Sequence, residues 1–501
     1  MGKTVEEINQ KIRDGSVHVV TAEEMTAIVE TLGPEGAAKE VDVVTTGTFG
    51  AMCSSGAILN FGHADPPIKM QKLRLNDVEA YTGLAAVDAY IGATQVSESR
   101  GMEYGGGHVI EELVSGKSVV LRTTGSGTDC YPLKNVETML TIEDLNQAIM
   151  INPRNAYQRY NAATNTSDQT MHTYMGPLLP DLGNVIYTGS GALSPLSNDP
   201  TYATIGMGTR IFLCGAQGYI IGEGTQHDPK NNMGTLMVKG NLKEMNSEFV
   251  KGASFHKYGT TLYVGLGIPI PILNEDIALC TGISDAEIKT EVLDYGVQRR
   301  EKPVLGEVTY EELKSGCIEI NGKEVRTSAI SSLYVARKVA ESLKDWVLKG
   351  EFMLTTPIEG LSTKPRVKPM RQTGGLLLVK DVMTAGIGTI KPDISIEEAA
   401  KRIIKGQFNH LPVVSDDGRL MGIITTWDVS KAVALAKRGR VEQIMTRKVV
   451  AVNPRDPIDI AARKLEQHNI SALPVIDAKR KVIGIITSED LSKLLTGGGH
   501  K

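Results

Sequence analysis

The chain has 501 residues, enough for two or three domains that each bury a core of their own. Hydrophobic residues make up 41%, charged residues 22% and the formal net charge is -4, which excludes a protein built to coat nucleic acid or a membrane surface. The N-terminus MGKTVEEINQ lacks an apolar signal region, and no apolar run of about 18 residues occurs. We therefore expect a cytoplasmic protein with neither nucleic-acid nor membrane partners.

The cysteines indicate reduced thiols and no metal centre. Cys53, Cys130, Cys214, Cys280 and Cys317 occur without a secretion signal, so a disulfide framework is not expected. None forms a C-x-x-C motif, and the chain therefore lacks the spacing for an iron–sulfur cluster or a structural zinc. Any electrons that the protein uses must come from another protein.

Strand-like and helical runs alternate irregularly over residues 1–354. A polar helix and the strand SVHVV (16–20) come first, and a capping box from Thr21 to Glu24 predicts a helix over 23–33. The runs TIEDLNQAIM (141–150) and SSLYVARKVAESLKDWVL (331–348) read as helices, and KSGCIEINGKEVRTS (314–328) reads as a hairpin that turns at Asn321-Gly322. Strands are predicted at VDVVTT (41–46), SVVLRTT (118–124), NVIYTG (184–189), RIFLCG (210–215), GYIIG (218–222) and TLYVGLG (261–267). The pattern predicts an α/β fold with a mixed-sheet N-terminal domain.

A linker and a direct repeat follow this domain. Residues 355–375, TTPIEGLSTKPRVKPMRQTGG, are rich in Pro, Gly and cations and lack apolar periodicity, which predicts a linker. After it, the chain repeats itself at an offset of 62 residues, so that Met383 matches Met445 and the GIIT at 422–425 matches the GIIT at 484–487. Each copy reads as a helix, two β-branched strands and a closing helix.

The repeat resembles a pair of CBS motifs over residues 376–497, with copies at 376–437 and 438–497. The motifs MT, LPVV and GIITTWD recur in the same order as MT, LPVI and GIITSED. The resemblance implies a tandem α+β pair whose Thr425, Asp428, Thr487 and Asp490 hold an adenosyl ligand, either S-adenosylmethionine, AMP or ATP. In an alternative interpretation Asp428 and Asp490 only cap helices. CBS pairs usually associate face to face, so a homodimer is expected.

Two cysteines of the first domain lie in matching settings. Cys53 in VDVVTTGTFGAMCSSG and Cys130 in KSVVLRTTGSGTDCYP each follow a buried strand-like run and a loop of small residues. Backbone N–H groups that converge in such a loop favour the reactive thiolate form. The alternative is that both are buried structural thiols. The matching pair favours function.

Polar residues near these thiols are candidate substrate ligands. His63 and Lys69 follow Cys53 in a loop stiffened by two prolines, and Arg122 precedes Cys130. The segments YGGGHVIEE (104–112) and YTGSGALSP (187–195) are weaker candidates for anion-binding loops.

Longer segments resemble the homocysteine-biosynthesis family of anaerobic archaea and bacteria. They are KEVDVVTTGTFGAMCSSGAILNFGHADPPIKM, YTGLAAVDAYIGAT, YGGGHVIEELVSGK, GTDCYPLK and NPRNAYQRYN. The resemblance implies a sulfurtransferase that forms L-homocysteine from L-aspartate semialdehyde and sulfide, with no tightly bound cofactor and with Cys130 and Cys53 as its functional cysteines.

Within this resemblance, we expect Cys130 to carry a persulfide and Cys53 to resolve it as a disulfide, so both thiols should lie in one pocket. Electrons would come from a ferredoxin-like iron–sulfur protein. A backbone N–H nest or His63 would stabilise the developing alkoxide, and Lys69, Arg122 or Arg154 would bind the substrate carboxylate.

Two other functions fit parts of the sequence. One is a sensor of adenosyl ligands without enzymatic activity, which would tolerate alkylation of both cysteines. The other is a cysteine-dependent nucleotide dehydrogenase that contains a CBS pair, as in inosine-monophosphate dehydrogenases; there the pair is inserted into a (β/α)₈ barrel, whereas here it follows a linker.

Overall fold

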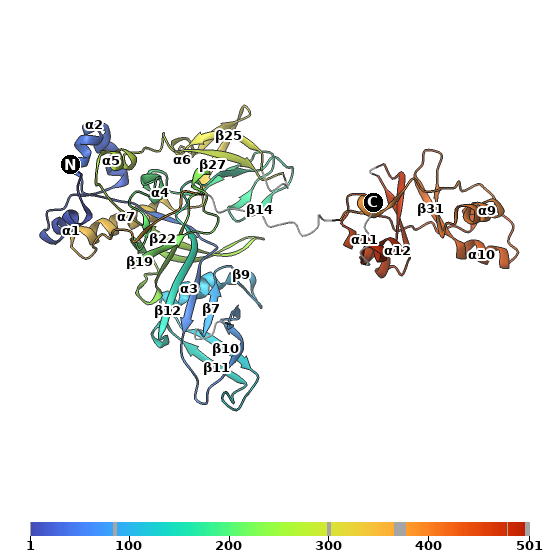
Figure 1. The fold of residues 1–501 in the computed structure, drawn as a ribbon, viewed down its shortest axis with the longest axis horizontal. Helices are drawn as coiled ribbons and strands as arrows, with labels where there is room; N and C mark the ends of the chain where they lie inside the picture. Colours follow the sequence, from blue (N-terminus) through green and yellow to red (C-terminus); the bar gives the residue numbers. More distant parts are fainter. Residues whose placement is uncertain (1, 84–87, 298–301, 365–376, 478, 496–501) are drawn as a thin grey trace. The chain divides into compact units, whose positions relative to one another are not determined.

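The computed structural model describes residues 2–83, 88–297, 302–364, 377–477 and 479–495 (Figure 1). It divides into two compact units, Met1–Lys368 and Pro369–Lys501. The part of the predicted linker at 365–375, and residues 376, 478, 496 and 497 of the predicted CBS pair, lie outside the described residues. Within the described part, no helix combines the length and apolar character needed to cross a membrane.

The first unit is a mixed α/β structure built on three large sheets. The largest has the strand order β21-β22-β18-β19-β20-β12-β4-β7, with β3 paired to β22. Its ladders are antiparallel. Its strands are β3 (Thr48–Ala51), β4 (Gly56–Asn60), β7 (Ala89–Gly92), β12 (Gln147–Asn155), β18 (Arg210–Leu213), β19 (Ala216–Glu223), β20 (Leu236–Asn241), β21 (Val250–Phe255) and β22 (Gly259–Gly267).

The second large sheet carries a long hairpin at one edge. Its order is β11-β10-β5-β6-β8-β9, so β11 is an edge strand and β10 is paired on both sides. Its strands are β5 (Met70–Leu75), β6 (Val78–Ala80), β8 (Val96–Ser97), β9 (Gly101–Gly105), β10 (Val119–Gly125) and β11 (Asn135–Leu140).

The third large sheet has the order β25-β24-β13-β16-β27-β26 and contains the parallel pairs β13–β24 and β16–β27. Its strands are β13 (Ala162–Thr164), β16 (Val185–Tyr187), β24 (Lys289–Asp294), β25 (Val304–Thr309), β26 (Cys317–Ile320) and β27 (Lys323–Ala329). Smaller sheets join β1 (Val19–Thr21), β2 (Val43–Thr45) and β23 (Pro269–Pro271); β14 (Met171–Thr173) and β15 (Gly176–Leu178); and β17 (Gly206–Met207) and β28 (Glu359–Gly360).

Helices of this unit begin at the caps that the sequence encodes. Thr21 accepts a hydrogen bond from the Glu24 N–H and the Glu24 carboxylate accepts one from the Thr21 N–H, which confirms the predicted capping box. The buried face of α7 packs on β3 and β22, and a Cβ at Gly47 would lie 2.1 Å from the Ala336 carbonyl oxygen of α7, so only glycine allows this approach. The helices are α1 (Val5–Asp14), α2 (Ala22–Glu40), α3 (Gly106–Val114), α4 (Pro195–Asn198), α5 (Glu275–Thr281), α6 (Tyr310–Lys314) and α7 (Leu333–Leu348).

Two sequence predictions in this unit are wrong in part. The run 141–150 is a 3₁₀ turn at Ile142–Asp144 followed by β12, because Ala148 and Met150 alternate into the core between β4 and β20. The predicted linker begins too early: Ile358 donates its N–H to the Met207 carbonyl, and β28 pairs with β17 on the first unit. By contrast, the hairpin at Asn321-Gly322 is confirmed, with φ of 54° and 77° at the two turn residues.

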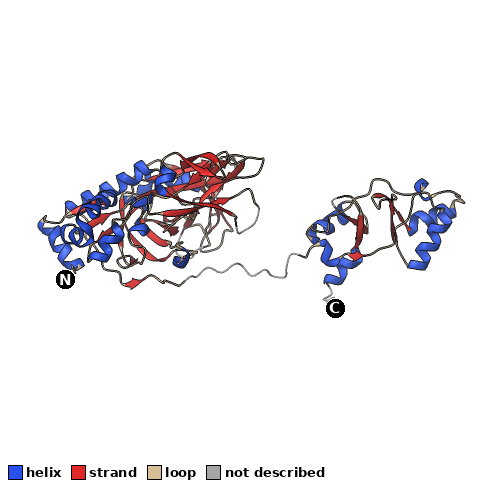
Figure 2. Cartoon of the chain, turned by 90° about the horizontal axis from the view of Figure 1, so that it is seen from above, coloured by secondary structure: helices blue, strands red, loops and turns tan. Residues whose placement is uncertain are grey.

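The second unit has the predicted duplicated α+β structure. In each copy, helices lie outside an antiparallel strand pair (Figure 2). The entry segment of the first copy, β29 (Thr384–Ala385), pairs with β33 of the second copy, whereas Thr446 bridges back to Ile423 of the first. The elements are α8 (Val379–Val382), α9 (Ile396–Gly406), β30 (His410–Val414), β31 (Leu420–Thr425), α10 (Thr426–Ala434), α11 (Ile458–Gln467), β32 (Ala472–Ile476), β33 (Val482–Thr487) and α12 (Ser488–Leu495).

Candidate active site

Cys53 lies in the turn that joins β3 to β4. The Ser55 N–H donates to the Met52 carbonyl at 3.0 Å and closes this turn. The Met52 N–H donates to Leu262 of β22, and the Ser55 carbonyl accepts from Ala93 just after β7, so both ends of the turn are tied to the large sheet. The half-buried thiol is therefore carried by a rigid support.

One side of this turn lines an open cleft of about 660 Å³, which we call the Cys53 cleft. Its residues come from the turn, from β6 and from the β7 region: Cys53, Ser54, Ser55, Glu79, Ala80, Tyr81, Tyr90, Gly92, Thr94 and Gln95. A cleft of this size suits a small-molecule ligand.

Two tyrosines and an arginine lie in the neighbourhood of the Cys53 turn. Ser54 Oγ donates to the Arg154 carbonyl at 3.3 Å, and the Arg154 guanidinium lies 5.8 Å from the centre of the Tyr157 ring. Burial raises the pKa of Tyr157, Arg154 opposes this, and Cys53 raises it further. Burial also raises the pKa of Tyr258, again with a contribution from Cys53. Both phenols thus lie in the electrostatic field of this sulfur. The sequence analysis missed them; the only signal was the segment NPRNAYQRYN, which contains Tyr157.

Cys130 lies at the exposed tip of the β10–β11 hairpin, in a loop over residues 126–134 that we call the Cys130 loop. The Thr128 and Tyr131 backbones exchange hydrogen bonds of 2.9 and 3.0 Å, which form a tight turn around the cysteine. The Leu133 N–H donates to the Pro67 carbonyl and anchors the loop to the segment before β5.

His63 and Lys69, two of the predicted substrate ligands, lie near Cys130 rather than near Cys53. The His63 and Tyr131 rings are 5.9 Å apart. A Cβ at Gly125, where the Cys130 loop begins, would lie 2.5 Å from the Lys69 carbonyl oxygen. The structure therefore brings the His63 ring and the Lys69 backbone next to the Cys130 loop.

Arg122, the third predicted ligand, lies on β10 and is already paired. It forms an exposed ion pair with Glu137 on β11 at 3.1 Å, and the side-chain hydrogen bond with Glu137 raises the pKa of Arg122. Exposed pairs of this kind contribute little to stability. Arg122 thus remains available to a ligand only in competition with Glu137.

The two thiols do not share a pocket in this structure. Cys53 precedes β4, whereas His63, which contacts the Cys130 loop, follows it. β4 has five residues and is roughly 17 Å long at about 3.3 Å per residue. Cys130 is absent from the lining of the Cys53 cleft. The expectation of one shared pocket is therefore wrong for this arrangement of the chain, because β4 separates the two sulfur atoms.

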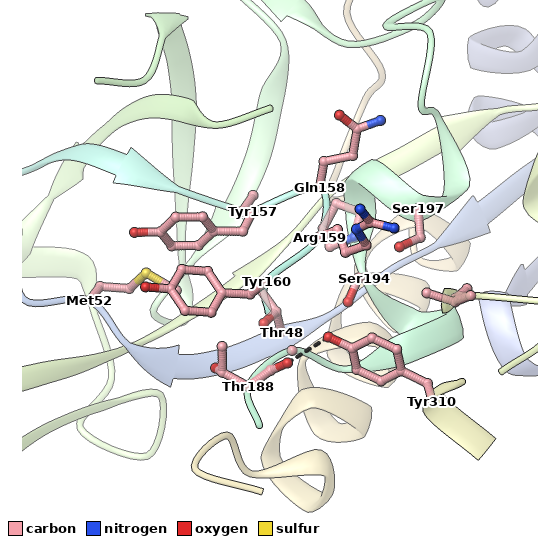
Figure 3. Close-up of a pocket in the computed structure, with 14 residues that line it drawn as sticks. Thr48, Met52, Tyr157, Gln158, Arg159, Tyr160, Thr188, Ser194, Ser197 and Tyr310 are labelled. Carbon is pink, nitrogen blue, oxygen red and sulfur yellow. Dashed lines mark hydrogen bonds between the residues drawn. The ribbon is translucent and has the colours of Figure 1, made fainter. Parts of the chain in front are cut away.

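A second, partly enclosed cavity is lined by Met52, the residue before Cys53; Figure 3 shows the residues around it. Tyr157 also lines it, and Arg159 lies among its polar residues. We call it the Arg159 cavity. Its hydroxyl-bearing residues are Thr48, Tyr157, Tyr160, Thr188, Ser194, Ser197 and Tyr310. The sequence indicated parts of it only weakly, through the loop 187–195 and the segment NPRNAYQRYN.

In the second unit, three of the four predicted ligand residues line one open cleft. Thr425, Thr487 and Asp490 lie around a space of about 620 Å³, and Asp428 lies behind Thr425. Asp428 Oδ2 accepts hydrogen bonds from the Thr425 N–H and hydroxyl at 2.8 and 2.7 Å, and Asp490 binds Thr487 in the same way. Both aspartates therefore cap helices, and the second oxygen of each carboxylate has no role in this contact.

Both units of the chain match known protein families. The family described as homocysteine biosynthesis enzyme, sulfur-incorporation, matches residues 17–354, and the CBS domain matches 379–435 and 441–497. L-aspartate semialdehyde sulfurtransferase of Methanosarcina acetivorans is 60% identical and covers 98% of this chain and 99% of its own. The enzyme of that name from Methanocaldococcus jannaschii is 52% identical, with 99% of each chain covered. A solved CBS domain pair in complex with 5′-methylthioadenosine and S-adenosyl-L-methionine is 46% identical over 25% of this chain and 99% of its own, with a TM-score of 0.23.

These matches are inconsistent with a nucleotide dehydrogenase. Such an enzyme needs a barrel of parallel strands, whereas the two sheets that carry Cys53 and Cys130 are antiparallel. The two matched relatives are similar to this chain over both units.

Proposed function

Because this chain belongs to the homocysteine-biosynthesis family of sulfur-incorporating enzymes, we propose that Cys130 and Cys53 carry out its sulfur transfer. The chain is an L-aspartate semialdehyde sulfurtransferase that forms L-homocysteine from the aldehyde and sulfide. The observation that supports this most strongly is the 60% identity to a sulfurtransferase over nearly the whole of both chains.

The overall reaction requires two electrons. An aldehyde, hydrogen sulfide, two electrons and two protons give a primary thiol and water, so the carbonyl carbon is reduced while the sulfur keeps its oxidation level. Thiols are the redox groups that this chain supplies. The electron donor in this proposal is a ferredoxin-like iron–sulfur protein.

The two cysteines have different roles in the sulfur transfer. Hydrosulfide cleaves a Cys53–Cys130 disulfide, leaving a persulfide on Cys130 and a free thiolate on Cys53. The terminal sulfur of the persulfide adds to the aldehyde carbon, and the donor protein's two electrons, with two protons, remove the resulting hydroxyl as water. Cys53 then attacks the Cys130 sulfur, which releases homocysteine and forms the disulfide again.

Residues near the Cys130 loop serve the addition step. His63 stands close enough to the loop to protonate the alkoxide that forms when sulfur adds to the carbonyl. Lys69 binds the substrate carboxylate, and Arg122 assists it when its pair with Glu137 opens. All three side chains are exposed, so a substrate can reach them.

The scheme requires the two sulfur atoms to meet. A disulfide joins Cα atoms that are about 4.4–6.8 Å apart. The Cys130 loop must therefore reach the Cys53 cleft, either by rearrangement of the loop or from a second copy of the chain. The chain acts as a homodimer in this proposal, and the mass of an oxidised Cys53–Cys130 product on a non-reducing gel distinguishes the two routes.

The CBS pair regulates the enzyme through an adenosyl ligand. Thr425, Thr487 and Asp490 line a cleft with the hydroxyl and carboxylate groups that can bind a ribose diol. S-adenosylmethionine, AMP and ATP all carry that group. The site therefore binds the adenosyl group that these three ligands share. The protein acts in the cytoplasm, where these ligands occur.

Single cysteine substitutions test the function. Cys53→Ser and Cys130→Ser should each abolish homocysteine formation from sulfide and L-aspartate semialdehyde, whereas Cys317→Ser should retain it, because Cys317 lies on the distant β26 hairpin. Full activity of the Cys130→Ser enzyme would refute the persulfide scheme. Absence of homocysteine formation by the wild-type protein, together with adenosyl-ligand binding that survives alkylation of both thiols, would favour a sensor instead.

A further inference from the structure

The Arg159 cavity contains a hydrogen-bond donor that is not paired with an acceptor. Arg159 Nε is buried and has no hydrogen-bond partner among the described residues, although another guanidinium nitrogen donates to the Lys289 carbonyl at 3.1 Å. The guanidinium is always charged. A buried donor of this kind costs free energy unless something accepts its hydrogen bond.

The hydroxyl groups around Arg159 add further hydrogen-bonding groups that have no partner to donate to. The side-chain hydroxyls of Thr48 and Ser197 form no hydrogen bond with the described residues, and Ser194 Oγ accepts from the Ser190 N–H but donates to none of them. Two of the three phenols that line the cavity already donate elsewhere, Tyr160 to Tyr174 and Tyr310 to the Thr188 carbonyl. The Arg159 Nε–H and these free hydroxyls can all donate to one acceptor, such as an anion.

The charge in the cavity also favours an anion. No carboxylate among the described residues forms an ion pair with Arg159. The carboxylate of Asp285, which contributes to the pKa of the lining residue Tyr310, is itself bound to Lys314 at 2.6 Å. A ligand is thus the group that can neutralise the guanidinium.

The size of the cavity restricts the anion. Its free volume is about 30 Å³, enough for one or two water-sized groups, since one water needs roughly 10–15 Å³ on this measure. The amino-acid aldehyde is several times larger. Hydrosulfide, with a single heavy atom, is the reactant that fits.

The position of the cavity links it to Cys53. Met52 lines the Arg159 cavity, whereas the next three residues line the Cys53 cleft, so the turn separates the two spaces. Tyr157 also lines the cavity and lies in the field of the Cys53 sulfur. In Figure 3, Met52 and Tyr157 stand at one end of the cavity, with Arg159, Ser194 and Ser197 toward the other.

We propose that the Arg159 cavity is a subsite for hydrosulfide, held by Arg159 and the hydroxyls of Thr48, Ser194 and Ser197 next to the Cys53 turn. This inference rests on the proposed sulfurtransferase function, for which hydrosulfide is the sulfur source. The subsite concentrates the small anion beside the cysteine whose disulfide it cleaves.

Steady-state kinetics of the full-length enzyme test the subsite. Arg159→Gln should raise the KM for sulfide about tenfold or more, the effect of losing a charged hydrogen bond, and leave the KM for the aldehyde unchanged. Ser197→Ala, which removes one hydroxyl with little change in volume, should raise the same constant by a few-fold. Arg326→Gln, at an exposed position on β27, is the matched control and should change neither constant.

An increase confined to the KM of the aldehyde would overturn the proposal and make Arg159 a carboxylate ligand instead. Unchanged constants in both cavity variants would overturn it as well, because the cavity would then hold only water.

A binding measurement separates the subsite from the enzymatic function. Crystals of the full-length wild-type protein soaked in bromide should show an anomalous peak in the Arg159 cavity, and Arg159→Gln crystals should lack it. Bromide at surface positions only would refute the subsite. Bromide in the cavity of a protein that forms no homocysteine would leave the anion site standing and refute the sulfurtransferase function.

Discussion

The imidazole ring of His63 lies 5.9 Å from the phenol ring of Tyr131, so the loop after β4 contacts the loop that carries Cys130. This contact places Cys130 at the far end of β4 from Cys53. Cys130, at which sulfur adds to the aldehyde, and Cys53, the resolving thiol, therefore lie near opposite ends of β4. The catalytic cycle has to bring the two thiols together.

His63 is expected to act in the addition step. His63→Asn should lower kcat about a hundredfold, the usual effect of losing a general acid, and leave alkylation of Cys53 unchanged. His468→Asn, at an exposed position in the CBS pair, is the matched control. Equal kcat for wild type and His63→Asn would remove His63 from the mechanism.

Lys69 and Arg122 should differ in their effect on substrate binding. Lys69→Gln is expected to raise the KM for the aldehyde about tenfold, whereas Arg122→Gln should have a smaller effect, because Arg122 is paired with Glu137. Lys72→Gln, an exposed lysine of β5, serves as the control. A larger effect of Arg122→Gln than of Lys69→Gln would reverse the assignment.

The cysteines should react with iodoacetamide in an order set by exposure and charge state. Cys130 is exposed and should be labelled first, and the half-buried Cys53 should follow. Burial raises the pKa of Cys214 to about 12, so at about pH 8 its thiol stays protonated and unlabelled. Peptide mass spectrometry over time measures the order. Early labelling of Cys214 would show that the core around β18 opens readily.

The CBS aspartates should affect ligand binding without affecting basal turnover. Asp490→Asn is expected to weaken binding of an adenosyl ligand such as S-adenosylmethionine about tenfold, through the lost hydrogen bond to ribose. Calorimetry on the full-length chain measures it, and Asp459→Asn on α11 is the control. Unchanged affinity would mean that the aspartates only cap their helices.

Local signals in the sequence predicted much of the fold. The capping box at Thr21, the turn at Asn321-Gly322 and the 62-residue repeat each depend on residues close together in the chain. The repeat also predicted four ligand residues, of which three line one cleft.

Features that depend on distant contacts were not predictable in this way. The segment 141–150 has helical residues, but its pairing with β4 and β20 turns its second half into a strand. The matching settings of Cys53 and Cys130 suggested one pocket, yet strand direction, which one sequence does not reveal, separates them. The Arg159 cavity combines residues from five separate stretches of the chain, and none of these stretches is distinctive alone.

Mass spectrometry of the full-length protein treated with sulfide and a mild oxidant tests the central claim most directly. The account predicts an added mass of about 32 Da, one sulfur atom, on the peptide that contains Cys130, and its loss when L-aspartate semialdehyde and reductant are added. Sulfur that accumulates on Cys53 alone, or on neither thiol, would contradict the account.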